Sequence, residues 1–387
     1  MSDDHVLERF GYDLNAAARR GDLEPVRCRD AEIARMVDIL LRQTKHNPAL
    51  VGAAGVGKTA LAEGLAQRIV AGEVPAALRE SRLVSLDHTA LLAGTIYRGQ
   101  YEERVRKLVE AVTADPDVIL FIDEMHNLIG QGSAMGVAMD AANMLKPALM
   151  REDMRVIGAT TAAEYERWIR GDPALERRFQ PLVVNELTGE QAMDVLRARR
   201  PRLEHHHAVA ISDDALQAAR VLTDRFITDR AQPDKAIDVL DEACAHAQAT
   251  ATLPAELERV VSERRRVDAA IRRRLARGER PESESHEGGP DEDPIETFAN
   301  QIGPALQRLG AEIDRIFGAP EDGERAKKVE PAGAPAGPER SETLLERRDR
   351  LDTELRRGLE RLGIVVTGAD IARAVGAAVG KRIEWAG

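Results

Sequence analysis

The stretch GAAGVGKT, residues 52–59, decides the fold of this chain. It has the spacing Gly-x-x-x-x-Gly-Lys-Thr of a phosphate-binding loop, in which glycines let backbone N–H groups point at phosphates. A helix that begins at the lysine adds partial positive charge. We expect Lys58 to reach the β- and γ-phosphates of a nucleotide and the Thr59 hydroxyl to bind Mg²⁺. The predicted nucleotide contacts in this loop are Gly52, Ala53, Ala54, Gly55, Val56, Gly57, Lys58, Thr59 and Ala60.

The flanking sequence has the strand and helix that such a loop requires. An apolar run precedes the loop, and a helical pattern over 58–71 follows it. Further apolar runs alternate with helical patterns such as 100–113. The runs predicted as buried strands are 48–52, 82–87, 118–123, 154–161 and 181–186. Strands that alternate with helices predict an α/β fold, a doubly wound parallel sheet with helices on both faces, over residues 1–187.

The run VILFIDE, residues 118–124, predicts the second half of the site. Its apolar residues form a central strand that delivers Asp123 to the carboxyl edge of the sheet, beside the phosphate-binding loop. There Asp123 and Thr59 would hold Mg²⁺, and Glu124 would orient and polarise the attacking water. Adjacent acids also occur at ordinary exposed strand ends, but the upstream loop favours the catalytic interpretation.

Polar residues beside the next two strands complete the predicted site. VIGATT (156–161) ends in Thr161, a candidate for sensing the γ-phosphate and the attacking water. LERRFQ (175–180) places two arginines just before a strand. Charged pairs are usually solvated, but an arginine from a neighbouring subunit would stabilise a γ-phosphate transition state, so oligomerisation is part of the hypothesis. The predicted catalytic residues are Lys58, Glu124, Thr161, Arg177 and Arg178.

The chain changes character after the predicted sheet. Residues 188–254 carry three helical patterns and predict a helical subdomain. Residues 255–362 hold charged helical ends around Pro/Gly-rich, acidic sequence that we expect to be flexible. The first end is arginine-rich and could bind nucleic acid, but no aromatic residue interleaves it, so a solvated helix face is favoured. Residues 363–387 predict a short C-terminal helical segment.

Composition narrows the class of protein. The formal net charge of −11 argues against a general nucleic-acid-binding or membrane-binding surface. An acidic start without an apolar signal core, and no apolar run long enough to span a bilayer, predict a cytoplasmic protein. Cys28 and Cys244 lie far apart in sequence, so neither a disulfide framework nor a zinc site is expected. The three consecutive histidines of LEHHHAV (203–209) cannot all face one ion on a regular element.

These motifs, in this order, resemble the AAA+ ATPases, and more narrowly the first ATPase module of the Clp unfoldases and disaggregases (the ClpA, ClpB and ClpC branch). The resemblance runs from about Leu7 to Thr252 and includes VILFIDEMHNLIGQG, DPALERRFQ and PDKAIDVLDEA. It implies Mg²⁺-dependent hydrolysis of ATP to ADP and phosphate. It also implies a hexameric ring in which Arg177 and Arg178 are arginine fingers. The helical subdomain would be a lid over the nucleotide, with Asp234 and Lys235 in the closing segment.

The segment TIYRGQY, residues 95–101, matches the first pore loop of that family. The resemblance implies that Tyr97, with Arg98 and Gly99 beside it, grips an extended polypeptide in the channel of the ring. Residues 130–136 correspond to the second pore loop. By itself, such a tyrosine would more often be an ordinary surface or core residue. Ile96 departs from the family, which commonly has a basic residue before the tyrosine.

Other departures keep two functions open. Arg27–Cys28 replaces the usual Ile–Gly of the adenine-contacting segment, so adenine recognition is an open question. We recognise no full coiled-coil middle domain, N-terminal substrate domain, second ATPase module or peptidase-docking loop, so a compartmental peptidase is not an expected partner. The leading hypothesis is an ATP-hydrolysing ring that pulls protein substrates through a central pore. The alternative is a nucleotide-dependent regulatory or scaffold ATPase that threads nothing. A DNA-loading module ranks third, because the basic segment lacks a reading element.

Overall fold

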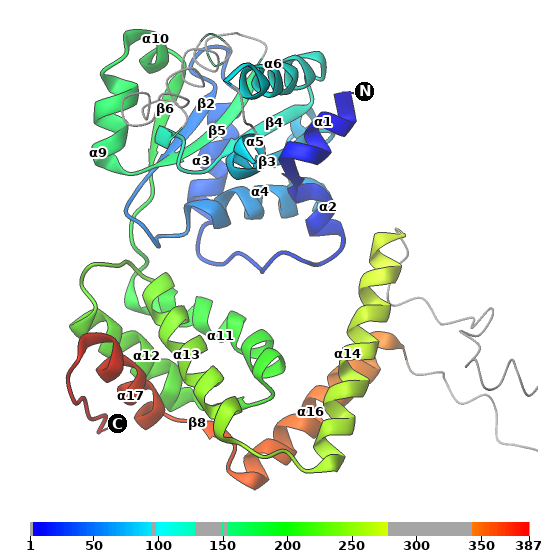
Figure 1. Cartoon of the computed structure of the whole chain (residues 1–387), viewed down its shortest axis with the longest axis vertical. Helices are drawn as coiled ribbons and strands as arrows, with labels where there is room; N and C mark the ends of the chain where they lie inside the picture. Colours follow the sequence, from blue (N-terminus) through cyan, green and yellow to red (C-terminus); the bar gives the residue numbers. More distant parts are fainter. Residues whose placement is uncertain are drawn as a thin grey trace, which may run out of the picture.

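The computed structural model describes residues 3–93, 98–127, 147, 149, 154–277 and 343–386. Figure 1 shows three parts: a sheet covered by helices at the top, a group of helices below it, and a helical hairpin to one side. The predicted fold class, an α/β part followed by helical parts, is confirmed. The Pro/Gly-rich, acidic segments 281–294 and 319–340, which we expected to be flexible, lie outside the described residues.

The sheet has six strands in the order β1-β3-β4-β5-β2-β6. Their bounds are β1 Gly11–Asp13, β2 Asn47–Val51, β3 Arg82–Leu86, β4 Val118–Ile122, β5 Arg155–Thr160 and β6 Phe179–Val183. All neighbouring strands are parallel except β1, which pairs antiparallel with β3. The five predicted strands are therefore confirmed. The edge strand β1 was not predicted, because GYD is too short to form an apolar run.

Alternate residues of the central strand β4 enter two different cores, as the period of a strand requires. Val118, Leu120 and Ile122 belong to one core, and Ile119 and Phe121 to the other. The first core is covered by α1 (Asp3–Phe10), α5 (His88–Leu92) and α6 (Arg98–Ala114), with α9 (Ala162–Glu164), η2 (Tyr165–Arg170) and α10 (Pro173–Glu176) at one end. The second is covered by α2 (Leu14–Arg19), α3 (Asp30–Leu40) and α4 (Lys58–Ala71), with the short turn η1 (Ala76–Leu78). Each fully buried side chain of such a core contributes about 1.5–3 kcal/mol, so the strand ends are held rigidly.

The parallel register brings three strand ends to one edge of the sheet. Val51 of β2 pairs with Thr160 of β5, and Ile122 of β4 pairs with Gly158 of β5. The residues that follow β2, β4 and β5 therefore leave the sheet side by side. This is the carboxyl edge, where ligands of open α/β sheets bind.

The helical part contains α11 (Gly189–His207), α12 (Asp213–Phe226), α13 (Asp234–Thr250) and α17 (Gly368–Val379). Two short strands, β7 (Ala210–Ile211) and β8 (Val365–Val366), pair in parallel. Ile371 and Val375 of α17 share one core with α12 and α13. The segment after residue 363 therefore packs into the same core as residues 189–250.

The hairpin consists of α14 (Ala255–Ala276) and α16 (Leu344–Leu362), which run antiparallel (Figure 1). Leu351, Leu355 and Leu359 follow the spacing of one helix face and pack with apolar residues of α14. Arg264 of α14 is buried and is held by Asp352 of α16. Within the described ranges, no helix combines the length and the apolar character that a membrane span needs.

Candidate functional site

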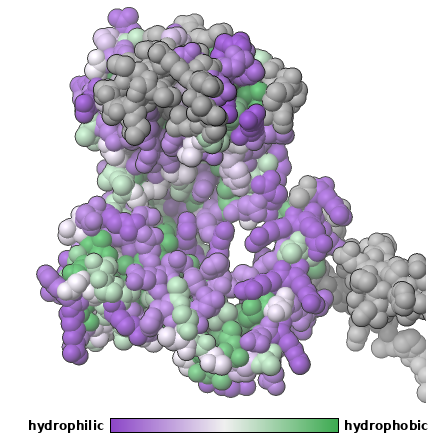
Figure 2. Space-filling model, viewed as in Figure 1, coloured by the Kyte–Doolittle hydropathy of each residue, from purple (hydrophilic) through white to green (hydrophobic). Residues whose placement is uncertain are grey.

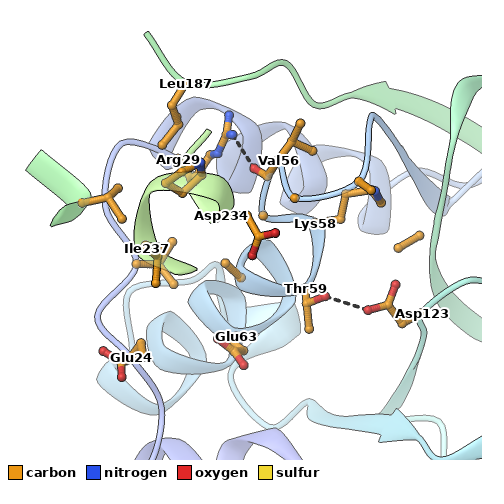
Figure 3. Close-up of a pocket in the computed structure, with 18 of the residues that line it drawn as sticks. Glu24, Arg29, Val56, Lys58, Thr59, Glu63, Asp123, Leu187, Asp234 and Ile237 are labelled. Atoms are coloured by element: carbon orange, nitrogen blue, oxygen red, sulfur yellow. Dashed lines mark hydrogen bonds between the residues drawn. The ribbon is translucent and has the colours of Figure 1, made fainter. Parts of the chain in front are cut away.

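A pocket of about 510 Å³ lies at the carboxyl edge of the sheet, between the α/β part and the helical part. Its size falls within the range of ligand pockets, roughly 300–1,000 Å³. The loop before α4 and the ends of β4 and β5 form one end, with Lys58, Thr59 and Asp123 (Figure 3). The segment before α3, α4 itself and helices α11 and α13 form the other end. We call these the phosphate end and the base end.

Backbone geometry of the loop over residues 52–59 explains its glycines. Gly55 and Gly57 have φ values of +82° and +91°, a left-handed conformation that glycine adopts without strain. A side chain on Gly55 would also collide with Asp234, because its Cβ would lie 2.8 Å from the Asp234 Cβ. Helix α4 begins directly after Gly57, so its first N–H groups face the pocket.

The Lys58 ammonium rests on the carbonyl groups of its own loop. Its Nζ donates to the oxygen of Gly52 at 3.0 Å and to that of Ala53 at 2.8 Å. Partial burial lowers the pKa of Lys58, and the nearby Asp123 carboxylate opposes this effect. Gly52 and Ala53, two of the predicted nucleotide contacts, thus accept hydrogen bonds from Lys58 through their carbonyl oxygens. Neither residue lines the pocket. A phosphate entering this end would offer the ammonium a charged acceptor in place of these neutral ones.

Thr59 and Asp123 meet across the phosphate end. The Thr59 hydroxyl donates to Asp123 Oδ2 at 2.6 Å (Figure 3), and the Glu124 amide donates to Asp123 Oδ1 at 2.9 Å. Hydroxyl and carboxylate oxygens are the ligands that Mg²⁺ prefers, so this pair fits the ion. No group of three or more metal-ligating side chains occurs in the part of the chain described by the structure. The two residues therefore fit the kind of Mg²⁺ site that substrate phosphates and water complete.

Glu124 has an unusual backbone conformation for its residue type, with φ +47°. Its side chain is exposed, and its Oε2 accepts a hydrogen bond from Asn127 Nδ2 at 2.8 Å. This bond fixes one carboxylate oxygen and leaves the other for a water molecule. Asn127 was not among the predicted site residues.

Thr161 lies at the end of β5, where its side chain caps the short helix α9. Its hydroxyl donates to Glu164 Oε2 at 2.7 Å, and Thr160 donates to the same oxygen at 3.1 Å. His126 Nδ1 lies 3.0 Å from that oxygen. Burial alone would raise the pKa of Glu164, but the hydrogen bonds from Thr161 and Thr160, together with the nearby His126, outweigh it and lower the pKa. Glu164 was not among the predicted site residues, although the spacing Thr-x-x-Glu, typical of a capping box, could have predicted its contact with Thr161.

The base end is built around a buried cation, Arg29. Its guanidinium donates to the carbonyl oxygens of Val56 at 2.7 Å (Figure 3) and Asn185 at 2.9 Å, and to Glu32 at 2.6 Å. Arg29 thereby ties the segment before α3 to the phosphate-binding loop. Arg27 also lines the pocket, and Cys28 beside it has φ +59°, although it is not a glycine.

Further charged and apolar side chains line the base end. Glu24, Glu63, Leu187 and Ile237 surround it in Figure 3, and Arg199 of α11 also lines it. Burial raises the pKa of Glu63, which Arg199 partly opposes. None of these residues was predicted, because they come from separate segments and no local motif marks them.

Several predicted residues lie away from the pocket. Arg177 and Arg178, between α10 and β6, do not line it, and Arg177 is exposed. Asp234 does line it and accepts a hydrogen bond from Arg230 at 2.9 Å. Lys235 is buried and does not line it; its ammonium lies 3.3 Å from Glu186 Oε1 and 3.2 Å from Asp224 Oδ1.

The predicted pore loops are largely outside the described residues. Tyr97 and residues 130–136 fall there, while Arg98 and Gly99 begin helix α6.

Two family models match consecutive parts of the chain. Residues 48–187 match the ATPase family associated with various cellular activities (AAA), and residues 188–288 match the AAA lid domain. The boundary between the two matches falls between β6 and α11.

Individual relatives agree with these matches. The chain is 56% identical over 239 residues to the chaperone protein ClpB of Aquifex aeolicus, covering 62% of this chain and 24% of that protein. It is 49% identical over 271 residues to the ATP-dependent Clp protease ATP-binding subunit ClpC of Staphylococcus epidermidis, covering 69% and 33%. The chain thus spans about a quarter to a third of the length of these relatives. Among solved structures, an Hsp104:casein complex of S. cerevisiae is 42% identical with a TM-score of 0.57, covering 63% of this chain and 42% of that one.

Proposed function

This chain belongs to the AAA ATPases, with an AAA module followed by an AAA lid, and we propose that it is an ATP-hydrolysing ring that remodels protein substrates by pulling them through a central pore. One observation carries the proposal. The Thr59 hydroxyl and the Asp123 carboxylate meet at 2.6 Å beside the phosphate-binding loop, with Glu124 next in the chain. Binding, metal coordination and water activation thus converge on one edge of the sheet.

Each residue at the phosphate end has a chemical task in hydrolysis. The loop amides and Lys58 bind the phosphates of ATP. Mg²⁺ held by Thr59 and Asp123 would neutralise charge on the β- and γ-phosphates. Glu124 orients a water and accepts its proton as the oxygen attacks the γ-phosphorus, while the bond to the β-phosphate oxygen breaks and ADP leaves. Thr161, one residue beyond β5, would sense the γ-phosphate.

Two arginines supply the argument for assembly. Arg177 and Arg178 lie outside the pocket of their own chain, and Arg177 is exposed. An arginine that stabilises the γ-phosphate transition state can come from a neighbouring subunit. We therefore propose a homo-hexameric ring in which these residues complete the site of the next copy.

The protein substrate is proposed from relatives and from one loop. A relative is named a chaperone, and a structural neighbour is described as a complex with casein. In this chain, Tyr97 with Arg98 and Gly99 would contact the substrate. An amphipathic aromatic ring can contact extended polypeptides of many sequences.

Two variants test hydrolysis and pulling separately. Glu124→Gln should keep ATP binding, lower ATP turnover by at least a hundredfold and trap an assembled ring, measured by an ATPase assay and by light scattering with and without ATP. Tyr97→Ala should spare basal turnover and abolish unfolding of a tagged model protein, whereas Tyr12→Ala, at an exposed tyrosine on the sheet edge, should change neither. Wild-type turnover in Glu124→Gln, or a chain that stays monomeric with ATP, would refute the proposal.

A regulatory or scaffold ATPase is the second candidate function, and the hairpin favours it. His205 Nε2 of α11 lies 3.0 Å from Asp268 Oδ2 of α14, so a contact between polar side chains joins the helical part and the hairpin. Such a connection could report the nucleotide state without any threading. This candidate predicts ATP-dependent assembly and turnover, no substrate unfolding by the wild-type chain, and no effect of Tyr97→Ala.

A further inference from the structure

A second cavity, of about 580 Å³, lies between α11 and α14, next to the base end of the nucleotide pocket. Figure 2 shows a hollow between the helical part and the hairpin, rimmed mainly by hydrophilic residues. The walls carry four arginines, two carboxylates, the histidines His205 and His206, and the aliphatic side chain of Leu203. These charged residues are Arg199, Arg202, Arg265, Arg272, Glu24 and Asp241. We call this the arginine cavity.

Both carboxylates of the arginine cavity already have partners. Glu24 pairs with Arg202 at 2.7 Å, and Asp241 contacts His207 at 2.8 Å. In the described ranges, Arg265 and Arg272 make no ion pair or hydrogen bond, and Arg199 makes no ion pair. The guanidinium groups of Arg265 and Arg272 thus face the cavity without a carboxylate of their own, while the charge of Arg199 also acts on Glu63 of the nucleotide pocket.

This arrangement differs from the rest of the chain, which is acidic, with 66 Asp and Glu against 55 Lys and Arg. On the same helix, Arg264 forms ion pairs with Asp268 and Asp352. Acids are therefore plentiful in the chain, yet the two carboxylates that line the arginine cavity are outnumbered by its four arginines. Unpaired cations that converge on a concave surface raise the local concentration of anions.

The spacing of the arginines indicates the class of ligand. Arg265 and Arg272 are seven residues apart, so they lie on one face of α14, about 10 Å apart along its axis. Arg199 faces them from α11. A guanidinium binds phosphate oxygens through two parallel hydrogen bonds. Three guanidinium groups spread over this length can contact several linked phosphate groups, whereas a single phosphate would be too small to reach all three. We propose that the arginine cavity is a second binding site, for a chain of phosphate groups.

The arginine cavity and the nucleotide pocket share a wall, because Glu24 and Arg199 line both. A phosphate chain must therefore be measured with the nucleotide pocket already filled. Inorganic tripolyphosphate is the probe, titrated calorimetrically into the full chain saturated with ADP at fixed free Mg²⁺. We expect saturable binding with one equivalent per chain.

A matched pair of double variants tests the assignment. Arg265→Gln with Arg272→Gln should weaken tripolyphosphate binding at least tenfold. Arg259→Gln with Arg266→Gln removes two exposed arginines of the same helix and the same spacing, which line a different surface with Leu344, and should weaken it less than twofold. Circular dichroism checks that both double variants keep their helices.

Three results would overturn the proposal: no saturable binding to the ADP-saturated chain, equal weakening by the two pairs, or no weakening by either. Equal weakening would mean diffuse attraction to a basic helix, which salt screens. A second arm with excess ADP separates the sources of phosphate. If the wild-type chain binds a second equivalent of ADP and the Arg265→Gln/Arg272→Gln variant does not, the ligand is the phosphate chain of a nucleotide. If the cavity binds tripolyphosphate but no second ADP, the ligand is a free phosphate chain.

Discussion

The two ends of the nucleotide pocket are built in different ways. The phosphate end consists of short segments that directly follow β2, β4 and β5, so a buried sheet fixes Thr59 and Asp123 against each other. The base end combines the segment before α3 with α11 and α13 of the helical part. Its charged residues include Glu24, Glu63 and Arg199, which come from three separate elements.

We infer from this difference that the phosphate end carries out hydrolysis, while the base end sets nucleotide affinity. A displacement of the helical part would move Arg199 and Ile237 while the phosphate end kept its geometry. Substitutions at the phosphate end should therefore affect binding and turnover strongly, and substitutions at the base end should affect affinity and stability modestly.

Lys58→Ala should produce the largest loss. It removes the ammonium from the phosphate end, a charge-assisted contact worth about 3 kcal/mol, so ATP affinity should fall on the order of a hundredfold. Titration calorimetry with a non-hydrolysable ATP analogue measures it. Lys107→Ala is the control, because Lys107 makes only an exposed pair with Glu103 at 3.0 Å. Similar affinities of the two variants for the ATP analogue would show that Lys58 does not bind the phosphates.

Sequence reasoning reached the phosphate end because its residues follow local patterns. Glycine spacing marked the loop, and an apolar run ending in two acids marked Asp123 and Glu124, so the family resemblance and the fold class are confirmed. At the base end, only the segment with Arg27 and Cys28 and the lid residue Asp234 were expected, both from the family resemblance. Glu63 and Arg199 were not predicted, because they meet only after the helical part folds against α4.

One pair of neighbours shows the limit of predicting side chains from a motif. Asp234 and Lys235 were assigned together to the nucleotide. On a helix, adjacent residues point about 100° apart. Asp234 faces the pocket, while the buried Lys235 faces Glu186 and Asp224. A structural role for Lys235, joining the segment after β6 to the helical part, follows from these contacts.

Asn127→Ala should have the next largest effect, on turnover alone. It removes the 2.8 Å hydrogen bond that holds the Glu124 carboxylate, so kcat should fall roughly tenfold while KM stays within twofold. Steady-state ATPase kinetics measures both constants. In a Glu124→Gln background the same change should have no additional effect, because the two residues act as a unit. An additive loss in the double variant would show that Asn127 acts elsewhere.

Cys28→Val should disturb the base end through the backbone. Cys28 has φ +59°, a conformation that is costly for a β-branched residue, so thermal unfolding should show a loss of about 1–2 kcal/mol. ADP affinity should fall severalfold, while kcat at saturating ATP stays within twofold. Cys28→Gly restores the residue type that this conformation favours and should match or exceed the wild-type stability. A fall in kcat as large as that expected for Asn127→Ala would contradict the prediction that the base end affects affinity and stability but not turnover.

Glu63→Gln should give the smallest effect, visible in its pH dependence. Burial raises the folded-state pKa of Glu63 above its ordinary value of 4.5, so the folded chain holds this proton more tightly than the unfolded chain. Stability from this group is therefore fully present below the unfolded pKa and decreases as pH rises through the folded pKa. Glu63→Gln removes that decrease, so the variant should gain stability relative to wild type as pH rises above about 4.5, by less than about 1 kcal/mol because Arg199 partly offsets the cost. Thermal unfolding at several pH values measures the gain, and Glu73→Gln, at an exposed glutamate, is the control. A gain that shrinks with rising pH would contradict the prediction. It would show that Arg199 stabilises the Glu63 carboxylate more than burial destabilises it.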